Sequence, residues 1–423
     1  MPPALAPNKK LRIAIWHNAA SGGTKRALFH HVQGLLERGH EIESWCPPTA
    51  NLSYLPLSPL IPEHVVPLTH LNGKENKKHR FFPETDQFRQ NHRAMVNHCR
   101  QCAEAIHRGG FDLLLANTSI YYAASPIGRF VKLPKAIYLQ EPARFLYEAR
   151  PGSGQRWQAR ASKHYQLWPP SNLSKMLAEF DALARCRVQA REEFANVKAF
   201  DAILANSAYS RESMVRTYGL DAQVCYLGID DTIFYPADVP RERYVIGLGA
   251  FDRRKGVDFA VKALAAMPEA KRPKLIWIAD SSDLNYREQT LALAKELKVE
   301  LEPKSGIPDA EIVHLLQRAS AMIYTSVLEP FGFAPLEANA CGTPAVAVAE
   351  GGVRETIKHG INGLLVPDRD PVAFATELER LLDAPDYARQ LGQAGLDEVR
   401  KHWTWEKAID RLENSLYRLL RPL

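Results

Sequence analysis

Short apolar runs alternate with amphipathic stretches along this chain of 423 residues, and the alternation occurs twice. In the first half, the strand pattern occurs at 12–17, 41–46, 112–118, 135–140 and 201–207. After a stretch rich in proline and charge, 231–243, it restarts at 244–250, 274–280, 321–326 and 344–350. Strands that alternate with helices predict parallel sheets with helices on both faces. We therefore expect two doubly wound, Rossmann-like α/β domains that face each other across a central cleft.

The length supports this division, because 423 residues exceed one ordinary domain. We expect a first domain over 1–235 and a second from 236 to 400. The remaining stretch, 401–423, has an amphipathic helical pattern and begins "KHWTWEKAIDRLENSLYRLL". Read alone, it is a C-terminal helix of the second domain.

Charge is divided unequally between the two halves. Residues 1–200 hold 27 Lys and Arg against 15 Asp and Glu, whereas residues 201–423 hold 27 against 33. A basic half favours an anionic partner, such as nucleic acid, a lipid headgroup layer or a phosphorylated acceptor. A scattered solvated surface explains the same numbers. Nucleic acid is the weakest of these partners, because the chain has no recognisable reader motif.

The cysteines and the apolar runs indicate the cellular compartment of the protein. Six scattered cysteines suit a reducing compartment. The first ten residues lack the apolar core of a secretory signal, and the run 113–128 is too short and too polar to span a membrane. We expect a cytoplasmic protein. We also expect that it can contact an anionic inner membrane surface peripherally, with residues 74–108 as the docking segment.

Two observations bear on metals. His98, Cys99 and Cys102 form a lone CxxC with one histidine, whereas zinc usually takes four ligands in paired clusters. This segment is interpreted as a structural helix face. No Asp-x-Asp triplet for holding a metal-bound nucleotide is identified, so no metal is expected.

The stretch "TSVLEPFGFAPLEANACGTPAVAV" places Glu329 and Glu337 on either side of a turn. Pro335 is predicted to open a helix, whose free N–H groups and dipole attract anions. Gly332 allows the backbone to approach a ligand closely. Glu337 would then lie in the first helical turn, where a carboxylate is stabilised by the dipole alone. Glu329 follows a strand and falls in the ligand-binding crevice of such a sheet.

These residues resemble the nucleotide-sugar-dependent glycosyltransferases of family 4, which have the two-domain GT-B fold. The resemblance rests on two glutamates separated by seven residues, followed by "EANACGTPAVA". Further matches in the family's order are "ASGGTKRAL", "YLQEPARFLYE", "ANSAYSRESMVRTYGLDAQVCYLGID", "GAFDRRKGVDFAVKAL" and "GGVRETIKHGINGLLV". They extend over almost the whole chain.

The resemblance implies specific roles in the second domain. Glu337 is expected to bind the ribose hydroxyls of the donor, and Glu329 to lie beside the transferred sugar. Backbone N–H groups of Gly332, Phe333 and Ala334 are expected to bind sugar hydroxyls and the β-phosphate. The resemblance also places Ile307 and Leu336 among the donor-binding residues.

The segment "GAFDRRKGVD" follows a predicted strand and could clamp a diphosphate. By resemblance, Lys255 has this role. The family's commonest form has an Arg directly after the first Gly, where this chain has Ala250. The arginine role is therefore assigned to Arg254, as in a variant form with Arg directly before Lys. A solvated basic turn is the alternative interpretation.

In the first domain, the resemblance implies that Gly22 and Gly23 let the backbone approach the donor phosphates. They do not form a P-loop, because the G-x-x-x-x-G-K-[ST] spacing is absent. Many relatives have a histidine where this chain has Gln140, which would contact the donor sugar but cannot transfer a proton. Glu141, Arg144 and Tyr147 are expected to face the acceptor.

The resemblance thus implies a retaining transferase that moves a hexose from GDP-mannose or a UDP-sugar to a saccharide, lipid-linked or other hydroxyl acceptor. No cofactor or metal is expected beyond the donor. It also implies that 401–423 crosses back to the first domain. Two alternatives stay open, a catalytically silent nucleotide-sugar-binding protein and a nucleotide-sugar 2-epimerase on the same fold. The glutamate spacing and the Lys255 loop disfavour the epimerase.

Overall fold

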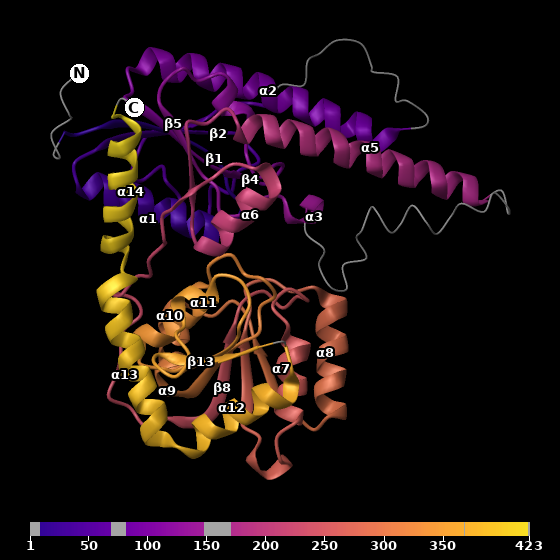
Figure 1. Ribbon diagram of the computed structural model, residues 1–423, viewed down its shortest axis with the longest axis vertical. Helices are drawn as coiled ribbons and strands as arrows, with labels where there is room; N and C mark the ends of the chain where they lie inside the picture. The colour runs from indigo at the N-terminus through magenta and orange to yellow at the C-terminus, as the bar shows by residue number, and fades with distance from the viewer. Residues whose placement is uncertain (1–8, 69–81, 148–170, 368, 422–423) are drawn as a thin grey trace. The chain divides into compact units, whose positions relative to one another are not determined.

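The chain forms two compact units, drawn in the computed structural model of Figure 1, which describes residues 9–68, 82–147, 171–367 and 369–421. Unit 1 combines the chain up to Asn206 with Arg211–Cys225 and Arg411–Leu423. Unit 2 combines Ser207–Ser210 with Tyr226–Asp410. The second unit therefore takes up the chain earlier than the boundary between residues 235 and 236 that the sequence suggested.

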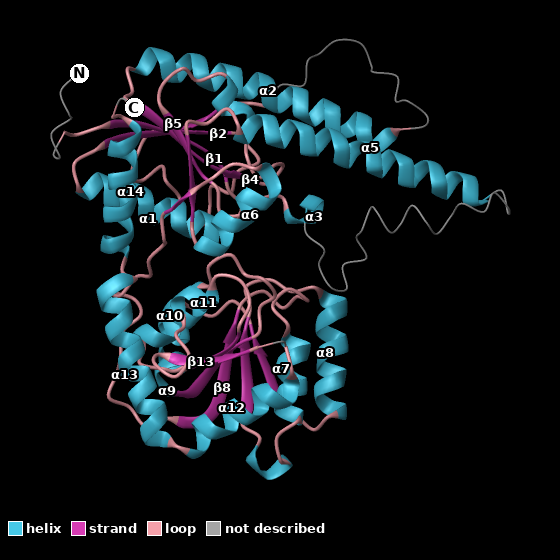
Figure 2. Cartoon of the chain, viewed as in Figure 1, coloured by secondary structure: helices cyan, strands magenta, loops and turns pink. Residues whose placement is uncertain are grey.

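Each unit is built on one parallel sheet (Figure 2). The sheet of unit 1 has the order β3 (Glu63–Val65), β2 (Glu41–Cys46), β1 (Arg12–Asn18), β4 (Leu113–Ser119), β5 (Lys135–Tyr138), β6 (Ala202–Ala205), β7 (Gln223–Val224). The sheet of unit 2 has the order β10 (Leu301–Lys304), β9 (Lys274–Ile278), β8 (Glu242–Leu248), β11 (Ala319–Tyr324), β12 (Ala345–Val348), β13 (Gly363–Val366). The predicted class of two doubly wound α/β domains is confirmed.

The helices follow the strands in alternation. Those of the first half are α1 (Gly23–Glu37), α2 (Pro83–Gly109), η1 (Pro126–Arg129), α3 (Arg144–Tyr147), α5 (Ser171–Val197) and α6 (Ala208–Tyr218). Those of the second half are α7 (Val257–Ala265), η2 (Glu269–Lys271), α8 (Leu284–Glu296), α9 (Asp309–Arg318), α10 (Phe333–Ala340), α11 (Val353–Thr356), α12 (Pro371–Asp383), α13 (Pro385–His402) and α14 (Trp405–Leu419). None of the helices within the described ranges is long and apolar enough to cross a membrane.

The strand order in each sheet reverses at one place. In unit 1 the chain runs outward from β1 to β2 and β3, then returns to β4 on the other side of β1. In unit 2 the same reversal separates β8 from β11. Helices that leave neighbouring strands in opposite directions open a crevice at the carboxyl ends, where ligands of such sheets bind. The fold therefore predicts one crevice in each unit.

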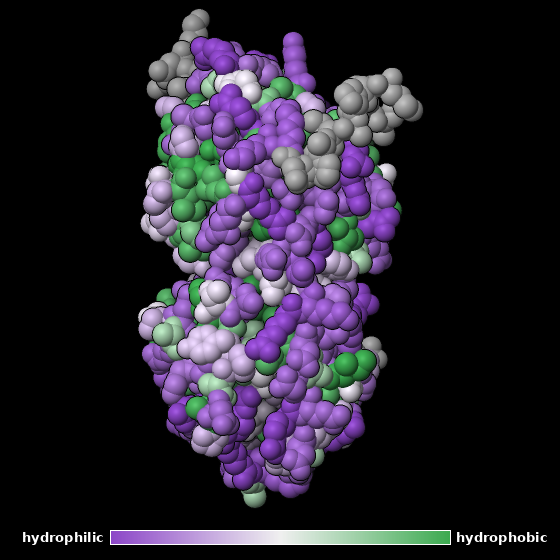
Figure 3. Space-filling view, turned by 90° about the vertical axis from the view of Figure 1, so that its left-hand side faces the viewer, coloured by the Kyte–Doolittle hydropathy of each residue, from purple (hydrophilic) through white to green (hydrophobic). Residues whose placement is uncertain are grey.

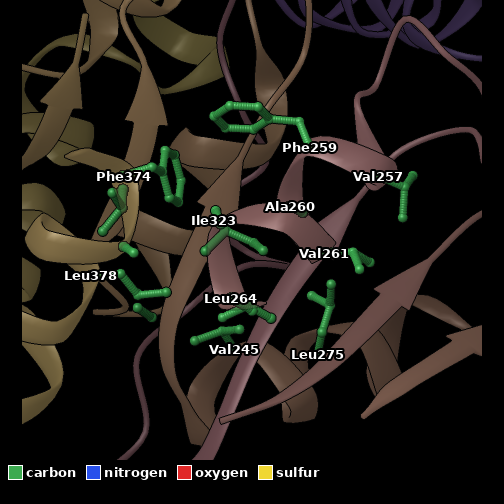
Figure 4. Close-up of a cluster of buried hydrophobic side chains, with 14 of the residues drawn as sticks. Val245, Val257, Phe259, Ala260, Val261, Leu264, Leu275, Ile323, Phe374 and Leu378 are labelled. Carbon is green, nitrogen blue, oxygen red and sulfur yellow. The ribbon is translucent and has the colours of Figure 1, made fainter. Parts of the chain in front are cut away.

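Buried apolar side chains hold the helices against the sheets. In unit 2, Phe259 and Leu264 of α7 pack with Phe374 of α12 and with strand residues such as Ile323 (Figure 4). The small residues Ala260 and Ala263 let α7 approach the sheet. A fully buried side chain of this size stabilises the fold by about 1.5–3 kcal/mol. The strands that lead into the unit 2 crevice are thus rigidly supported.

The end of the chain is anchored in unit 1 by polar contacts. The Glu413 carboxylate accepts from Arg38 Nη1 at 2.6 Å and is 2.8 Å from His40 Nε2. Gln223 Nε2 donates to Ser415 Oγ at 2.7 Å. Arg411–Leu423 are accordingly grouped with unit 1, while Trp405 and the preceding helix α13 are grouped with unit 2.

The surface is mainly polar. Hydrophilic residues cover most of the face drawn in Figure 3, and hydrophobic residues gather there in separate places. The predicted docking segment 74–108 falls partly on 69–81, outside the described residues, and partly on α2.

Candidate functional site

The loop after β8 presents Arg254 and Lys255 at the unit 2 crevice. One oxygen of Asp252 accepts from the backbone N–H of Arg254 at 2.9 Å and of Lys255 at 3.2 Å. Its other oxygen accepts from Arg254 Nε at 3.0 Å. This turn ends at Gly256, whose φ of +68° requires glycine, and where a Cβ would lie 2.5 Å from the Thr325 carbonyl oxygen. The loop is therefore fixed against the end of β11.

The loop after β11 carries Glu329 and is held by two glycines from the segment after β12. Gly352 N–H donates to the Glu329 carbonyl oxygen at 2.8 Å. A Cβ on Gly351 would lie 2.3 Å from that same oxygen, so the two backbones meet closely only because Gly351 has no side chain. Leu328, just before the glutamate, has a φ of +48°, which strains a residue other than glycine. Such strain is typical of a functional turn.

These two loops bring Lys255 and Glu329 together. Lys255 Nζ lies 2.7 Å from Glu329 Oε2, and the two side chains are 19% and 27% exposed. The pair stands at the carboxyl ends of β8 and β11, where the strand order of unit 2 reverses. A half-buried ammonium and carboxylate in this crevice can bind a diphosphate and a hydroxyl-bearing group, respectively.

Helix α10 begins beside this pair, two residues earlier than the sequence suggested. Its first residue is Phe333, and Gly332 precedes it with a φ of +89° and no side-chain cap. The N–H groups of Phe333 and Ala334 therefore lie in the first turn, where an α-helix leaves its donors unsatisfied. Pro335 is the third helical residue, and its missing N–H removes one of those donors. This helix start is suited to an anionic ligand.

The earlier start changes the interpretation of Glu337. The first turn of α10 contains no acidic residue, so Glu337 lies in the second turn. The expectation that it stabilises the helix dipole from the first turn was wrong, because that effect falls off within one turn. Glu337 is also only 4% exposed. A buried carboxylate needs polar partners, which fits a residue that binds hydroxyl groups.

The remaining residues assigned to the donor are dispersed between the units. Leu336 is fully buried, so its side chain packs in the core of unit 2. Phe333 is partly exposed and makes an edge contact with Phe331, at 5.3 Å between ring centroids. Ile307 lies on the loop between β10 and α9, two strands away from β8. Gly22, Gly23 and Gln140 belong to unit 1.

Unit 1 contains a cavity of about 320 Å³ at the carboxyl ends of β1, β4 and β5. Its lining includes three of the residues assigned to substrates, Gln140, Glu141 and Arg144. Ser21 and Thr24 also line it, on either side of Gly22 and Gly23. Gly22 has a φ of +104° and precedes the first residue of α1, Gly23. The cavity occupies the crevice that the strand order of unit 1 predicts.

Tyr147 is placed differently from the other residues assigned to the acceptor. It does not line this cavity. Its hydroxyl lies 3.5 Å from the Ala190 carbonyl oxygen, and its ring makes an edge contact with Tyr218. Burial raises the pKa of Tyr147. In this structure the side chain supports the wall between α3 and α5.

Glu193 is a residue that the sequence analysis missed. Its carboxylate accepts from the backbone N–H of Ala123 and of Ala143, each at 3.2 Å, and from the Tyr218 hydroxyl. Both alanines line the cavity. Burial raises the pKa of Glu193. Its position on a helix far from either loop in sequence gave no signal, and only the fold brings the three segments together.

A second buried polar cluster lies on the neighbouring strands β1, β2 and β3. Potential metal-ligating atoms of His17, Cys46 and Glu63 lie within 4.8 Å of one another. Among the described residues, this is the group whose spacing could hold a metal ion. His17 Nε2 is 3.1 Å from Glu63 Oε1. The buried Lys25 ammonium acts on the same carboxylate, and burial lowers the pKa of Lys25. Because the buried Lys25 carries a positive charge near this cluster, a divalent cation fits it poorly.

The CxxC segment has a structural role. His98, Cys99 and Cys102 are buried in α2. The Trp16 indole donates to His98 Nε2 at 3.2 Å, and His98 Nδ1 is 3.0 Å from the Val66 carbonyl oxygen. Burial raises the pKa of both thiols, which makes them poor nucleophiles and ligands.

Comparisons with known proteins place this site in context. The family described as Glycosyl transferases group 1 matches residues 231–397, which contain Lys255, Glu329 and α10. The D-inositol 3-phosphate glycosyltransferase 1 of Catenulispora acidiphila is 28% identical over 246 residues, covering 52% of this chain and 58% of that protein. The alpha-maltose-1-phosphate synthase of Mycolicibacterium smegmatis is 30% identical over 240 residues, covering 49% and 61%. The matched region thus spans little more than half of these relatives.

Solved structures resemble the whole chain. The sucrose-phosphate synthase from Thermosynechococcus elongatus covers 97% of this chain and 99% of its own, with a TM-score of 0.70 and 20% identity. An Anabaena protein, Alr3699/HepE, in complex with UDP and glucose covers 96% and 99%, with a TM-score of 0.67 and 17% identity. Both share the GT-B fold predicted for this chain. The match to the glycosyl transferases group 1 model falls within unit 2.

Proposed function

We propose that this protein transfers a hexose from a nucleoside diphosphate sugar to a hydroxyl group of an acceptor. The donor is GDP-mannose or a UDP-sugar, and the acceptor is a saccharide, a lipid-linked sugar or another hydroxyl compound. The family match over unit 2 supports the reaction class. The D-inositol 3-phosphate glycosyltransferase named above transfers a glycosyl group according to its name, which agrees with this assignment.

The observation that carries the proposal is the pair of Lys255 Nζ and Glu329 Oε2, 2.7 Å apart. In this structure the ammonium and the carboxylate neutralise each other's charge. An arriving diphosphate competes with Glu329 for the ammonium, and the released carboxylate can accept from hydroxyls of the sugar. Lys255 then stabilises the negative charge that develops on the leaving nucleotide.

Other groups complete the donor site in this proposal. Arg254 exchanges its exposed ion pair with Asp252 for the diphosphate when the donor binds. The N–H groups of Gly332, Phe333 and Ala334 bind the β-phosphate and sugar hydroxyls. Glu337 binds the ribose hydroxyls. The charge stabilisation comes entirely from side chains and backbone groups, so we propose a reaction without a metal.

Nucleotide release tests the proposal. The protein is incubated with UDP- and GDP-sugars, with and without saccharide acceptors, and free nucleoside diphosphate is measured. We expect release with at least one donor and a fall of about a hundredfold or more in Lys255→Ala, because one preorganised charge contributes on this scale. Lys262→Ala is the matched control, since Lys262 is exposed on α7 and paired with Asp258 at 3.3 Å. No release with any donor, or equal rates in both variants, would contradict the proposal.

The stereochemical outcome is proposed from the family resemblance. We propose retention at the anomeric carbon, with the leaving phosphate taking the acceptor proton, since Gln140 cannot do so. NMR of the product distinguishes retention from inversion. It also identifies a 2-epimerase, which would change the donor sugar without transferring it. Tight donor binding with no turnover would indicate the silent binding protein.

The excess positive charge of unit 1 supports contact with an anionic membrane. Arg93 and Arg100 of α2 line a second cavity with Arg129. Arg129 pairs with the Glu192 carboxylate at 3.0 Å, whereas Arg93 and Arg100 form no ion pair with a carboxylate among the described residues. We propose peripheral docking at the cytoplasmic face of an anionic membrane through this surface. Flotation with vesicles should rise with phosphatidylglycerol content and fall in Arg93→Glu/Arg100→Glu; flotation that ignores lipid charge would refute it.

A further inference from the structure

The lining of the unit 1 cavity is nearly neutral, although the surrounding half of the chain is basic. Unit 1 belongs to the basic half of the chain, where 27 Lys and Arg face 15 Asp and Glu in residues 1–200. Among the described lining residues, however, only Glu141 and Arg144 are charged. Their nearest charged atoms lie 3.3 Å apart. The cavity is therefore close to neutral in the part of the chain that the structure describes.

The rest of the lining is suited to hydroxyl groups and sugar rings. Polar side chains come from Asn18, Thr24, Thr118, Ser119, Gln140 and Gln189. Tyr121 and Phe145 line the cavity and are 37% and 47% exposed, so their rings are available to the apolar face of a sugar. A phosphate group placed here would have to compete with Glu141 for Arg144 and would meet no second cation among these lining residues.

Gln140 adds a fixed hydrogen-bond donor. Its Oε1 accepts from Thr24 Oγ1 at 3.1 Å, a contact between the segment just after β5 and the start of α1. This bond sets the orientation of the amide. Nε2 is buried and has no hydrogen-bond partner among the described residues. A buried donor without a partner carries a desolvation penalty, which an oxygen of a bound ligand removes.

We propose that this cavity is the acceptor site and selects a neutral, polyhydroxylated sugar over a phosphorylated one. Gln140 Nε2 donates to one oxygen of that sugar, and Thr24 is a positioning residue that holds the amide. This inference rests on the proposed transfer reaction. It moves Gln140 from the donor, where the family resemblance placed it, to the acceptor. It also separates this chain from relatives whose names specify a phosphorylated product or substrate.

Binding and transfer to matched acceptors test the selection. The probes are glucose, maltose and myo-inositol, each against its monophosphate, in the presence of saturating donor or nucleoside diphosphate. Binding is followed by saturation-transfer NMR and transfer by mass spectrometry. We expect binding and transfer with at least one neutral sugar and about tenfold weaker binding of its phosphate. Preference for the phosphate, or binding of neither form, would overturn the proposal.

Three variants test the amide. Gln140→Glu keeps an oxygen for Thr24 but removes the donor, and should weaken neutral-sugar binding about tenfold, the effect of one lost hydrogen bond to a buried group. Thr24→Val should weaken it less, and Thr24→Ser should restore it because the hydroxyl returns. Gln87→Glu is the control, since Gln87 is exposed on α2 and contacts Asn91. Unchanged sugar binding in Gln140→Glu would also overturn the proposal.

The stabilisation of each variant by nucleoside diphosphate separates the two hypotheses. The donor groups Lys255 and Glu329 belong to unit 2, whereas Gln140 and Thr24 belong to unit 1. One outcome is that the nucleotide stabilises every variant equally while the protein binds phosphorylated sugars more tightly than neutral ones. In that case only the inferred selection of a neutral sugar fails, and the proposed transfer reaction stands. If no nucleotide stabilises any protein, the proposed reaction fails first.

Discussion

Single residues control how closely the loops of unit 2 approach each other. Gly351 and Gly360 both have positive φ values, +68° and +74°, so alanine strains the backbone at either position. At Gly351 the new Cβ would also lie 2.3 Å from the Glu329 carbonyl oxygen, whereas nothing lies within 4 Å at Gly360. The pair therefore isolates the effect of a collision from the effect of strain.

We expect Gly360→Ala to lower stability by about 1 kcal/mol and leave turnover nearly intact. Gly351→Ala should lower stability further and reduce turnover about tenfold or more, because it displaces Glu329. Unfolding midpoints and donor turnover measure both effects. Equal turnover in the two variants would show that the exact position of the Glu329 loop does not matter.

His31 makes stability depend on pH. Burial lowers its pKa to about 3, so the folded protein resists a proton that the unfolded chain accepts below about pH 6.5. The associated stability is present above that pH and is lost as the pH falls toward the folded value. At about pH 5 the loss from this group is about 2 kcal/mol. Urea unfolding of His31→Phe should show a weaker decrease between about pH 7 and pH 5; an unchanged decrease would assign the effect elsewhere.

At the scale of elements, α5 connects distant parts of the unit 1 cavity. Glu193 holds the segments of Ala123 and Ala143 through their N–H groups. We expect Glu193→Gln to lower stability by about 1–3 kcal/mol, since the amide presents a donor to groups that are themselves donors. Acceptor turnover should fall while stabilisation by nucleotide persists. Glu104→Gln, on the exposed face of α2, is the control, and equal loss of nucleotide binding in Glu193→Gln would contradict a local role.

The elements that sequence predicts well are those with strong periodicity. The central strands β1, β2, β8 and β9 were found because each is a buried run of four or more apolar residues or a clear alternation. The edge strands β3, β7, β10 and β13 were missed, having only three, two, four and four residues. The start of α10 was placed too late because Pro335 is a strong signal, while Gly332 and Phe333 become a cap and a first turn only through backbone geometry.

The candidate site was predictable to different degrees for similar reasons. Lys255 and Glu329 each follow a strand, so the order of strands brings them together and the sequence pattern finds them. Glu193 and Thr24 act through contacts across 50 or more and 116 residues, respectively. No local pattern encodes such contacts, so they emerged only from the fold.

For the whole molecule, the division into two units allows ligand binding to be assigned to one unit or the other. A nucleoside diphosphate should stabilise unit 2, by about 2.7 kcal/mol at a hundred times its dissociation constant. Hydrogen exchange should slow in the segments 249–256 and 328–337, which carry the proposed donor contacts. The sheet edge at His17 and Glu63 in unit 1 provides the internal reference. Protection confined to unit 1 would contradict the assignment of the donor to unit 2.

The contact between Lys255 and Glu329 also affects which anions the proposed donor site would bind. An inorganic phosphate ion can take the ammonium away from the carboxylate, but it leaves that carboxylate half-buried without a partner. A nucleotide sugar brings both the negative charge for Lys255 and the hydroxyls for Glu329. In the proposed donor site, we therefore expect this ion pair to disfavour small anions and to favour a ligand that carries both a diphosphate and sugar hydroxyls.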